Sequence, residues 1–135
     1  MKKPSIACVV LCAGQGTRMK STLPKVLHEV AGLPMIGHVL ETATQLKPEE
    51  IVVVVGPKMG AVEKAVTGLD YDARFAVQHE ALGTGHAVRA AEEALEDFDG
   101  MVLVLYGDTP LIEAETLRAM TMTKAAVTVL GMRPK

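Results

Sequence analysis

Apolar residues follow two alternating patterns along the chain. Runs of consecutive β-branched and apolar residues predict strands covered on both faces, and apolar residues three and four positions apart predict helices. The predicted strands are residues 5–11, 51–55, 74–77, 101–105 and 125–132, and the predicted helices are residues 34–46, 58–67, 86–95 and 113–120. Strands that alternate with helices across short connections favour an α/β fold, in which a mostly parallel sheet carries helices on both faces.

The unusual segments of the sequence all follow a predicted strand. Residues 12–25 follow the first strand, residues 78–86 the third and residues 106–110 the fourth. In a parallel sheet the carboxyl ends of the strands meet at one edge, and ligands bind outside that edge. We therefore expect these three loops to form a single site.

The composition limits what this site can bind. The chain has 135 residues, which suits one domain, and 3% aromatic residues with a net charge of −2 do not fit a nucleic-acid-binding surface. No run approaches the roughly 20 apolar residues of a membrane span. The first 28 residues hold five of the 14 lysines and arginines and no acidic residue, which favours a small polyanion as the ligand.

The two cysteines, Cys8 and Cys12, are expected to be reduced. Four positions along one strand separate them by roughly 13 Å, whereas a disulfide needs Cα atoms within about 7 Å. Free thiols fit a cytoplasmic location, where the environment is reducing. Two cysteines without a nearby pair of histidines do not make a zinc site.

The first loop combines glycines with basic side chains. Gly14 and Gly16 let backbone amides approach a ligand closely, and Arg18 and Lys25 carry charges that suit phosphate oxygens. The spacing fits neither the loop Gly-x4-Gly-Lys-Ser/Thr nor the dinucleotide motif Gly-x-Gly-x-x-Gly, because Met19 stands where the third glycine would be. Phosphate binding is the favoured interpretation, and a glycine-rich turn flanked by surface charges is the alternative.

The second and third loops offer an amide and a carboxylate. The side chain of Gln78 has a donor and an acceptor that can read the edge of a nucleobase, whereas Thr84 could simply cap the following helix. Asp108 follows a buried strand and could hold Mg²⁺, although aspartate also forms turns before Thr-Pro. Isolated histidines are more often structural or solvated, so His79 and His86 receive no functional role.

Residues 11–25 resemble the signature loop of the nucleotidyltransferases that activate sugar phosphates. The continuation Pro-Lys-Val-Leu-His-Glu-Val-Ala-Gly-Leu-Pro-Met at 24–35 is similar to the N-terminal pyrophosphorylase domain of bifunctional N-acetylglucosamine-1-phosphate uridyltransferases, and so is segment 78–87. Cys12 departs from the commoner alanine, which is a small apolar change. The resemblance implies a Rossmann-like sheet of the nucleotide-diphospho-sugar transferase type.

The resemblance also assigns roles to individual residues. It implies that Arg18 and Lys25 are catalytic and that Asp108 binds Mg²⁺. The remaining matched positions would bind substrate together with Lys25, and they are Leu11, Ala13, Gly14, Gly16, Gln78, Gly83, Thr84, Tyr106 and Gly107. In the family, the residues that match Gln78, Gly83 and Thr84 hold uracil, and those that match Tyr106 and Gly107 lie near the sugar.

The implied reaction transfers UMP from UTP to N-acetylglucosamine 1-phosphate and releases pyrophosphate. Arg18 would stabilise charge on the transferred phosphoryl group, Lys25 would hold a phosphate, and Mg²⁺ on Asp108 would bridge phosphate oxygens. Two rival interpretations remain. One is a nucleotidyltransferase specific for another base, and the other is a non-catalytic nucleotide-binding module.

The chain is expected to hold the N-terminal part of one nucleotidyltransferase domain. Members of the resembled family continue well beyond residue 132, with a second metal ligand and most contacts to the acceptor sugar. Their C-terminal β-helix acetyltransferase domain, which builds a homotrimer, has no counterpart here. A fragment or a natural short form is therefore expected, and an incomplete sheet would favour self-association.

Overall fold

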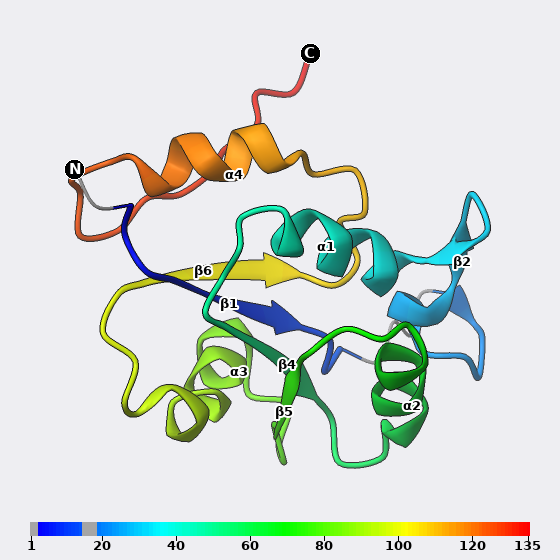
Figure 1. Cartoon of the computed structure of the whole chain (residues 1–135). Coiled ribbons are helices and arrows are strands. Elements are labelled where there is room, and N and C mark those ends of the chain that lie inside the picture. Colours follow the sequence, from blue (N-terminus) through cyan, green and yellow to red (C-terminus); the bar gives the residue numbers. More distant parts are fainter. Residues whose placement is uncertain (1–2, 15–18) are drawn as a thin grey trace.

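The computed structural model describes residues 3–14 and 19–135 and contains a sheet of four strands (Figure 1). Each strand is parallel to its neighbours, in the order β5-β4-β1-β6. The strands are β1 (Ile6–Leu11), β4 (Glu50–Val55), β5 (Arg74–Val77) and β6 (Met101–Tyr106). The parallel sheet predicted from the alternating pattern is thus confirmed.

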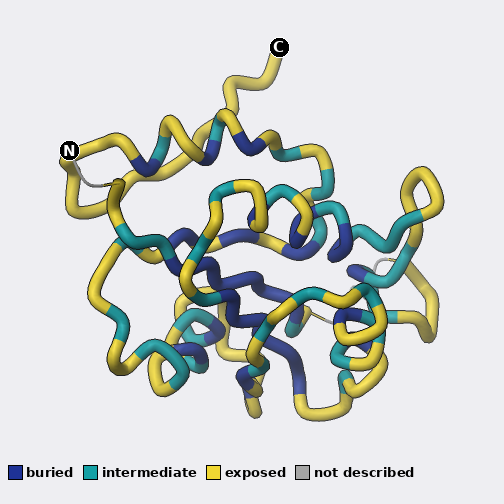
Figure 2. Tube along the Cα trace, in the orientation of Figure 1, coloured by how far each residue is buried: buried dark blue, intermediate teal, exposed yellow. Residues whose placement is uncertain are grey.

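Alternate residues of β1 enter two different hydrophobic cores. Cys8 and Val10 pack into a core with the apolar faces of α1 (Met35–Thr44), α2 (Gly60–Gly68) and α4 (Ala114–Thr121). Val9 and Leu11 pack on the opposite face of the sheet, where α3 (Thr84–Ala90) supplies the cover. The buried stretch therefore follows the central strands (Figure 2), with helices on both faces as expected.

The edge strand β6 is covered on one face only. Leu103 and Leu105 are buried with the α1 and α4 side, whereas Val102, Val104 and Tyr106 are exposed by 44%, 39% and 47% on the face shared with α3. Short α3 covers Val9 and Leu11 but leaves this part of the sheet bare. Self-association through such a surface stays a prediction.

The strand predicted at residues 125–132 is absent from the described structure. This segment has no regular structure and pairs with no described strand, and Val127 and Val129 are exposed by 78% and 83%. A β-branched run becomes a strand only where a neighbour satisfies its backbone groups and a layer covers its side chains. Residues 125–132 have neither, so the residue pattern alone gave the wrong prediction.

The helix predicted at 86–95 is shorter and begins earlier than expected. It forms α3 at Thr84–Ala90 and is followed by a separate 3-10 turn, η3 (Glu93–Leu95). Glu92, Glu93 and Glu96 would lie at the carboxyl end of a longer helix, where the macrodipole disfavours negative charge. The start of α3 is set by Gly83, which has φ +102° and ψ 177°.

A small antiparallel hairpin went unpredicted. It pairs β2 (Glu29–Val30) with β3 (Leu33–Pro34), directly after the 3-10 turn η2 (Lys25–Leu27). Ala31 and Gly32 at its tip have φ values of 52° and 79°, as the common two-residue turn requires. Nε2 of His38 lies 2.6 Å from the carbonyl oxygen of Val30 and ties the hairpin to α1.

Both cysteines are free, as predicted, and both are buried. Burial raises the pKa of the Cys8 thiol to about 11, which keeps it protonated near neutral pH. Across residues 3–14 and 19–135, no helix has the length and apolar character needed to cross a membrane.

Gly107 lets the end of β6 lie directly against the end of β1. Its N–H donates to the carbonyl oxygen of Leu11 at 3.0 Å. A Cβ atom on this residue would lie 2.6 Å from Sγ of Cys12 and 3.0 Å from Cγ1 of Val26. The first distance is far below van der Waals contact, so packing at this point requires the absence of a side chain.

Replacing Gly107 should therefore destabilise the fold. We expect Gly107→Ala to lower the free energy of unfolding by about 1–3 kcal/mol, because an added methyl group in a packed region forces its neighbours apart. Urea unfolding followed by circular dichroism measures the change. Gly68→Ala is the matched control, since a Cβ there meets nothing within 4 Å. Equal urea midpoints for the two variants would contradict the packing argument.

Candidate functional site

The three loops predicted to converge line one cavity of about 530 Å³. It lies where β1 and β6 end, and this is the switch point of the sheet: the chain proceeds from β1 to β4 and β5 on one side and then crosses to β6 on the other. The described residues that line it are Leu11, Cys12, Ala13, Gly14, Met19, Lys25, Val26, Gln78, Ala81, Gly83, Thr84, Ala87, Tyr106 and Asp108.

The first loop leads from the buried end of β1 into this cavity. The N–H of Cys12 still donates to the carbonyl oxygen of Val54 at 2.8 Å, so the sheet pairing continues past Leu11. A Cβ on Gly14 would meet nothing within 4 Å, which leaves open space beside the backbone. Gly16 and Arg18, which the sequence places in the same loop, lie outside the described residues.

Lys25 and Asp108 form an ion pair within the cavity. Nζ of Lys25 lies 2.8 Å from Oδ2 of Asp108, and the two side chains are 40% and 33% exposed. A pair this exposed is screened by water and contributes roughly 0–1 kcal/mol to stability. The ion pair is therefore weak enough to break when Asp108 binds a metal cation or Lys25 binds an anion.

Cys12 is not suited to nucleophilic attack despite its place in the cavity wall. Burial raises the pKa of its thiol, and the negative charge of Asp108 raises it further. A thiol held protonated in this way is a poor nucleophile, because the thiolate is the reactive form. In this cavity Cys12 acts as a small apolar residue.

Gln78 presents its side-chain amide at the end of β5. The residue is 7% exposed, and its N–H extends the sheet by donating to the carbonyl oxygen of Val55 at 2.8 Å. Its Nε2 lies 3.1 Å from the carbonyl oxygen of Gly83 and 3.0 Å from Nδ1 of His86. The loop and the first turn of α3 thus hold a buried amide in a fixed place.

Thr84 does not cap α3, which was the alternative raised from the sequence. It is the first residue of the helix, Gly83 occupies the cap position, and no side chain caps this end. Thr84 is exposed and lines the cavity, so its hydroxyl is available to a ligand.

The third loop contributes Tyr106 and Asp108 to the cavity wall. Tyr106 is 47% exposed at the end of β6. Gly107 does not line the cavity; its N–H is bound to Leu11, and it holds the two strand ends together. A role for Gly107 beside a ligand stays a prediction.

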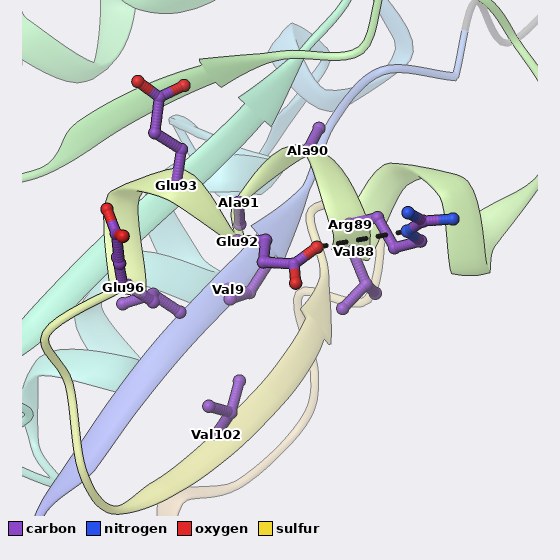
Figure 3. Close-up of a pocket in the computed structure, with 10 residues that line it drawn as sticks. Val9, Val88, Arg89, Ala90, Ala91, Glu92, Glu93, Glu96 and Val102 are labelled. Atoms are coloured by element: carbon purple, nitrogen blue, oxygen red, sulfur yellow. Dashed lines mark ion pairs between the residues drawn. The ribbon is translucent and has the colours of Figure 1, made fainter.

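A larger hollow of about 1110 Å³ lies under α3, beside the bare face of β6 (Figure 3). Val9 and Val102 of the sheet and Val88 of α3 line it, together with three glutamates, Glu92, Glu93 and Glu96. Arg89 adds a positive charge, 4.0 Å from Glu92. The excess of negative charge disfavours a polyanion, so the smaller cavity at the strand ends is the better phosphate site.

Sequence reasoning found most of the cavity and missed the contacts inside it. The predicted residues that line it are Leu11, Ala13, Gly14, Lys25, Gln78, Gly83, Thr84, Tyr106 and Asp108. The Lys25–Asp108 pair spans 83 positions, and no local pattern shows it. The Gln78–His86 contact spans the Gly-Thr-Gly turn, whose helix start the sequence placed too late. The functional roles of all these residues remain predictions.

Solved structures share this architecture. Rv0371c from Mycobacterium tuberculosis H37Rv is similar with a TM-score of 0.72 and 24% identity, over 89% of this chain and 60% of that chain. A structure of Rv0371c in complex with manganese gives a TM-score of 0.68 and 25% identity, over 86% and 57%. The likeness confirms the nucleotide-diphospho-sugar transferase type of fold.

Sequence comparisons carry the assignment further. Bifunctional protein GlmU of Paracoccus denitrificans (strain Pd 1222) is 52% identical over 131 residues, which are 97% of this chain and 29% of that protein. The corresponding protein of Paramagnetospirillum magneticum (strain ATCC 700264 / AMB-1) is 50% identical over 100% of this chain and 30% of its own length. The chain thus spans less than a third of these relatives. The model of the MobA-like NTP transferase domain matches residues 8–131, and the chain belongs to that family.

Proposed function

We propose that this chain forms the nucleotide-binding part of a sugar-1-phosphate uridylyltransferase. The reaction would transfer UMP from UTP to N-acetylglucosamine 1-phosphate and release pyrophosphate. The observation that carries the proposal is that Lys25, Gln78 and Asp108, from three separate strand-end loops, line one cavity. The 52% identity to a GlmU protein supports the choice of substrates.

The cavity suits a nucleotide in size and in its mixture of groups. Its volume of about 530 Å³ lies within the range of roughly 300–1,000 Å³ typical of small-molecule sites. Gln78 and Thr84 offer an amide and a hydroxyl for the base, and Gly83 lines the cavity beside them. The backbone at Ala13 and Gly14, with Lys25, offers donors and charge for the phosphates.

A divalent cation fits Asp108 as its protein ligand. No group of three or more His, Cys, Asp or Glu residues gathers anywhere in residues 3–14 and 19–135, so these residues form no closed metal cage. Mg²⁺ often binds through one or two carboxylates, with phosphate oxygens and water completing its coordination. When bound with UTP, the ion would neutralise phosphate charge at the reacting centre. The manganese complex of Rv0371c supports a divalent metal in this fold.

The residues of the site would act by positioning and by charge. A sugar-phosphate oxygen would attack the α-phosphorus in line, and the P–O bond to pyrophosphate would break, with no covalent enzyme intermediate. Lys25, released from Asp108 as the carboxylate takes up the cation, would hold a phosphate oxygen. Arg18 would stabilise the charge of the transferred group and of pyrophosphate; this assignment depends on the sequence alone.

Nucleotide binding is the first test of this proposal. With Mg²⁺ present, isothermal titration calorimetry of the chain should show that UTP binds more tightly than CTP or GTP. Gln78→Leu should weaken UTP binding about tenfold, because a base-edge hydrogen bond is lost and its partner is left unsatisfied. Gln45→Leu is the control, since this exposed glutamine lies outside the cavity. A chain that binds all three nucleotides equally, or none, would refute the proposal.

Metal binding in the absence of nucleotide tests whether a cation can replace Lys25 as the partner of Asp108. The Lys25 ammonium competes with a cation for Asp108, so Lys25→Met should tighten Mn²⁺ binding about two- to fivefold, the strength expected of an exposed pair. Asp108→Asn should weaken Mn²⁺ binding. Electron paramagnetic resonance of free Mn²⁺ measures both effects.

The Lys25 variant also separates its two proposed roles. Lys25→Met should bind UTP more weakly while binding the bare cation more tightly. Lys64→Met, which removes an exposed lysine outside the cavity, should change neither. Weaker Mn²⁺ binding by Lys25→Met would show that the lysine does not compete for the carboxylate.

A further inference from the structure

The orientation of the Gln78 amide follows from its neighbours. The carbonyl oxygen of Gly83, 3.1 Å from Nε2, can only accept a hydrogen bond. An amide turned the other way would place Oε1 against that oxygen. The residue is 7% exposed, so water has little access to relieve such a contact. Gln78 therefore directs its NH₂ group toward Gly83.

His86 accepts the second hydrogen of the same NH₂ group. Its Nδ1 lies 3.0 Å from Nε2 of Gln78, and an amide nitrogen donates but does not accept. Nδ1 must therefore carry a lone pair, which places the ring proton on Nε2. His86 lies in the first turn of α3, and Gly83 occupies the cap position of that helix with φ +102°, so one local structure supplies both acceptors.

Oε1 is then the group that Gln78 can offer to a ligand. Both hydrogens of its NH₂ group are used, and no described residue donates to the oxygen. Uracil and thymine carry an N–H at position 3 of the base, which can donate to Oε1, whereas cytosine has an acceptor there. To donate to N3 of cytosine, the amide would have to turn over and give up its bond to Gly83.

We propose that His86 is a positioning residue that, together with the Gly83 carbonyl, holds the Gln78 amide so that the site selects a nucleobase with a donor N–H. The inference depends on the proposed function, because it takes Gln78 as the residue that meets the base. Gln78 lines the nucleotide cavity and also a second cavity of about 390 Å³. His86 lines the second cavity but not the nucleotide cavity. His86 thus acts through Gln78 and does not itself line the nucleotide cavity.

The first experiment measures the ratio of the UTP and CTP dissociation constants. His86→Phe keeps a ring but loses the acceptor. It should reduce the ratio of the CTP dissociation constant to the UTP dissociation constant roughly tenfold. His86→Asn should restore most of it, because Oδ1 of asparagine and Nδ1 of histidine lie the same number of bonds from Cα. His79→Phe is the control, since His79 lines the same second cavity and has no hydrogen bond to Gln78. An unchanged preference in His86→Phe, with normal UTP binding, would overturn the inference and leave the proposed function intact.

The second experiment needs no nucleotide. ¹⁵N NMR of the ligand-free chain should show His86 with a protonated Nε2 and an unprotonated Nδ1, and His86→Phe should shift the side-chain NH₂ signals of Gln78. A ring with its proton on Nδ1 would overturn the inference. If the NMR result holds but the chain shows no preference for UTP, the amide is oriented as described and its role in base selection is wrong.

Discussion

The parallel pairing of β1 with both β4 and β6 is the constraint on which this structure depends. Because β1 lies between them, its carboxyl end faces loops that leave the sheet in opposite directions, and a crevice opens there. The tight contact of Gly107 with Leu11 and Cys12 keeps the two strand ends in register. The cavity thus originates in the topology, and the side chains that line it come from the ends of β1, β5 and β6 and from the segments that follow them.

Two of the polar side chains that line the cavity have partners within the protein. Lys25 neutralises Asp108, and Gly83 and His86 accept both hydrogens of the Gln78 NH₂ group. The two arrangements differ in kind. An exposed ion pair is weak in water and can exchange its partners, whereas hydrogen bonds to a nearly buried amide are costly to break. The charged groups Lys25 and Asp108 can consequently change partners when a ligand binds, whereas the orientation of the Gln78 amide is fixed.

Sequence patterns predicted the parts of this molecule that depend on local chemistry. Continuous apolar runs identified β1 and β4, which are buried on both faces of the sheet, and also the less covered edge strands β5 and β6. Glycine and polar residues after the strands identified the cavity wall. The pattern failed at 125–132, where strand formation depends on a neighbour that local residues cannot reveal. It also failed to find the partners of Gln78 and Asp108, because side-chain pairs across loops depend on where helices begin and on how strands cross.

Family membership indicates the class of reaction, whereas the geometry of the cavity bears on which nucleobase is bound. The match over residues 8–131 points to nucleoside triphosphate chemistry but not to a base, since members of one fold can differ in the ligand they accept. The base must be selected by particular atoms, and an amide is ambiguous because rotation by half a turn exchanges its donor and acceptor. Only its surroundings can remove that ambiguity. A backbone carbonyl is well suited to this task, because its polarity cannot change with protonation, and an adjacent imidazole can adopt the matching tautomer.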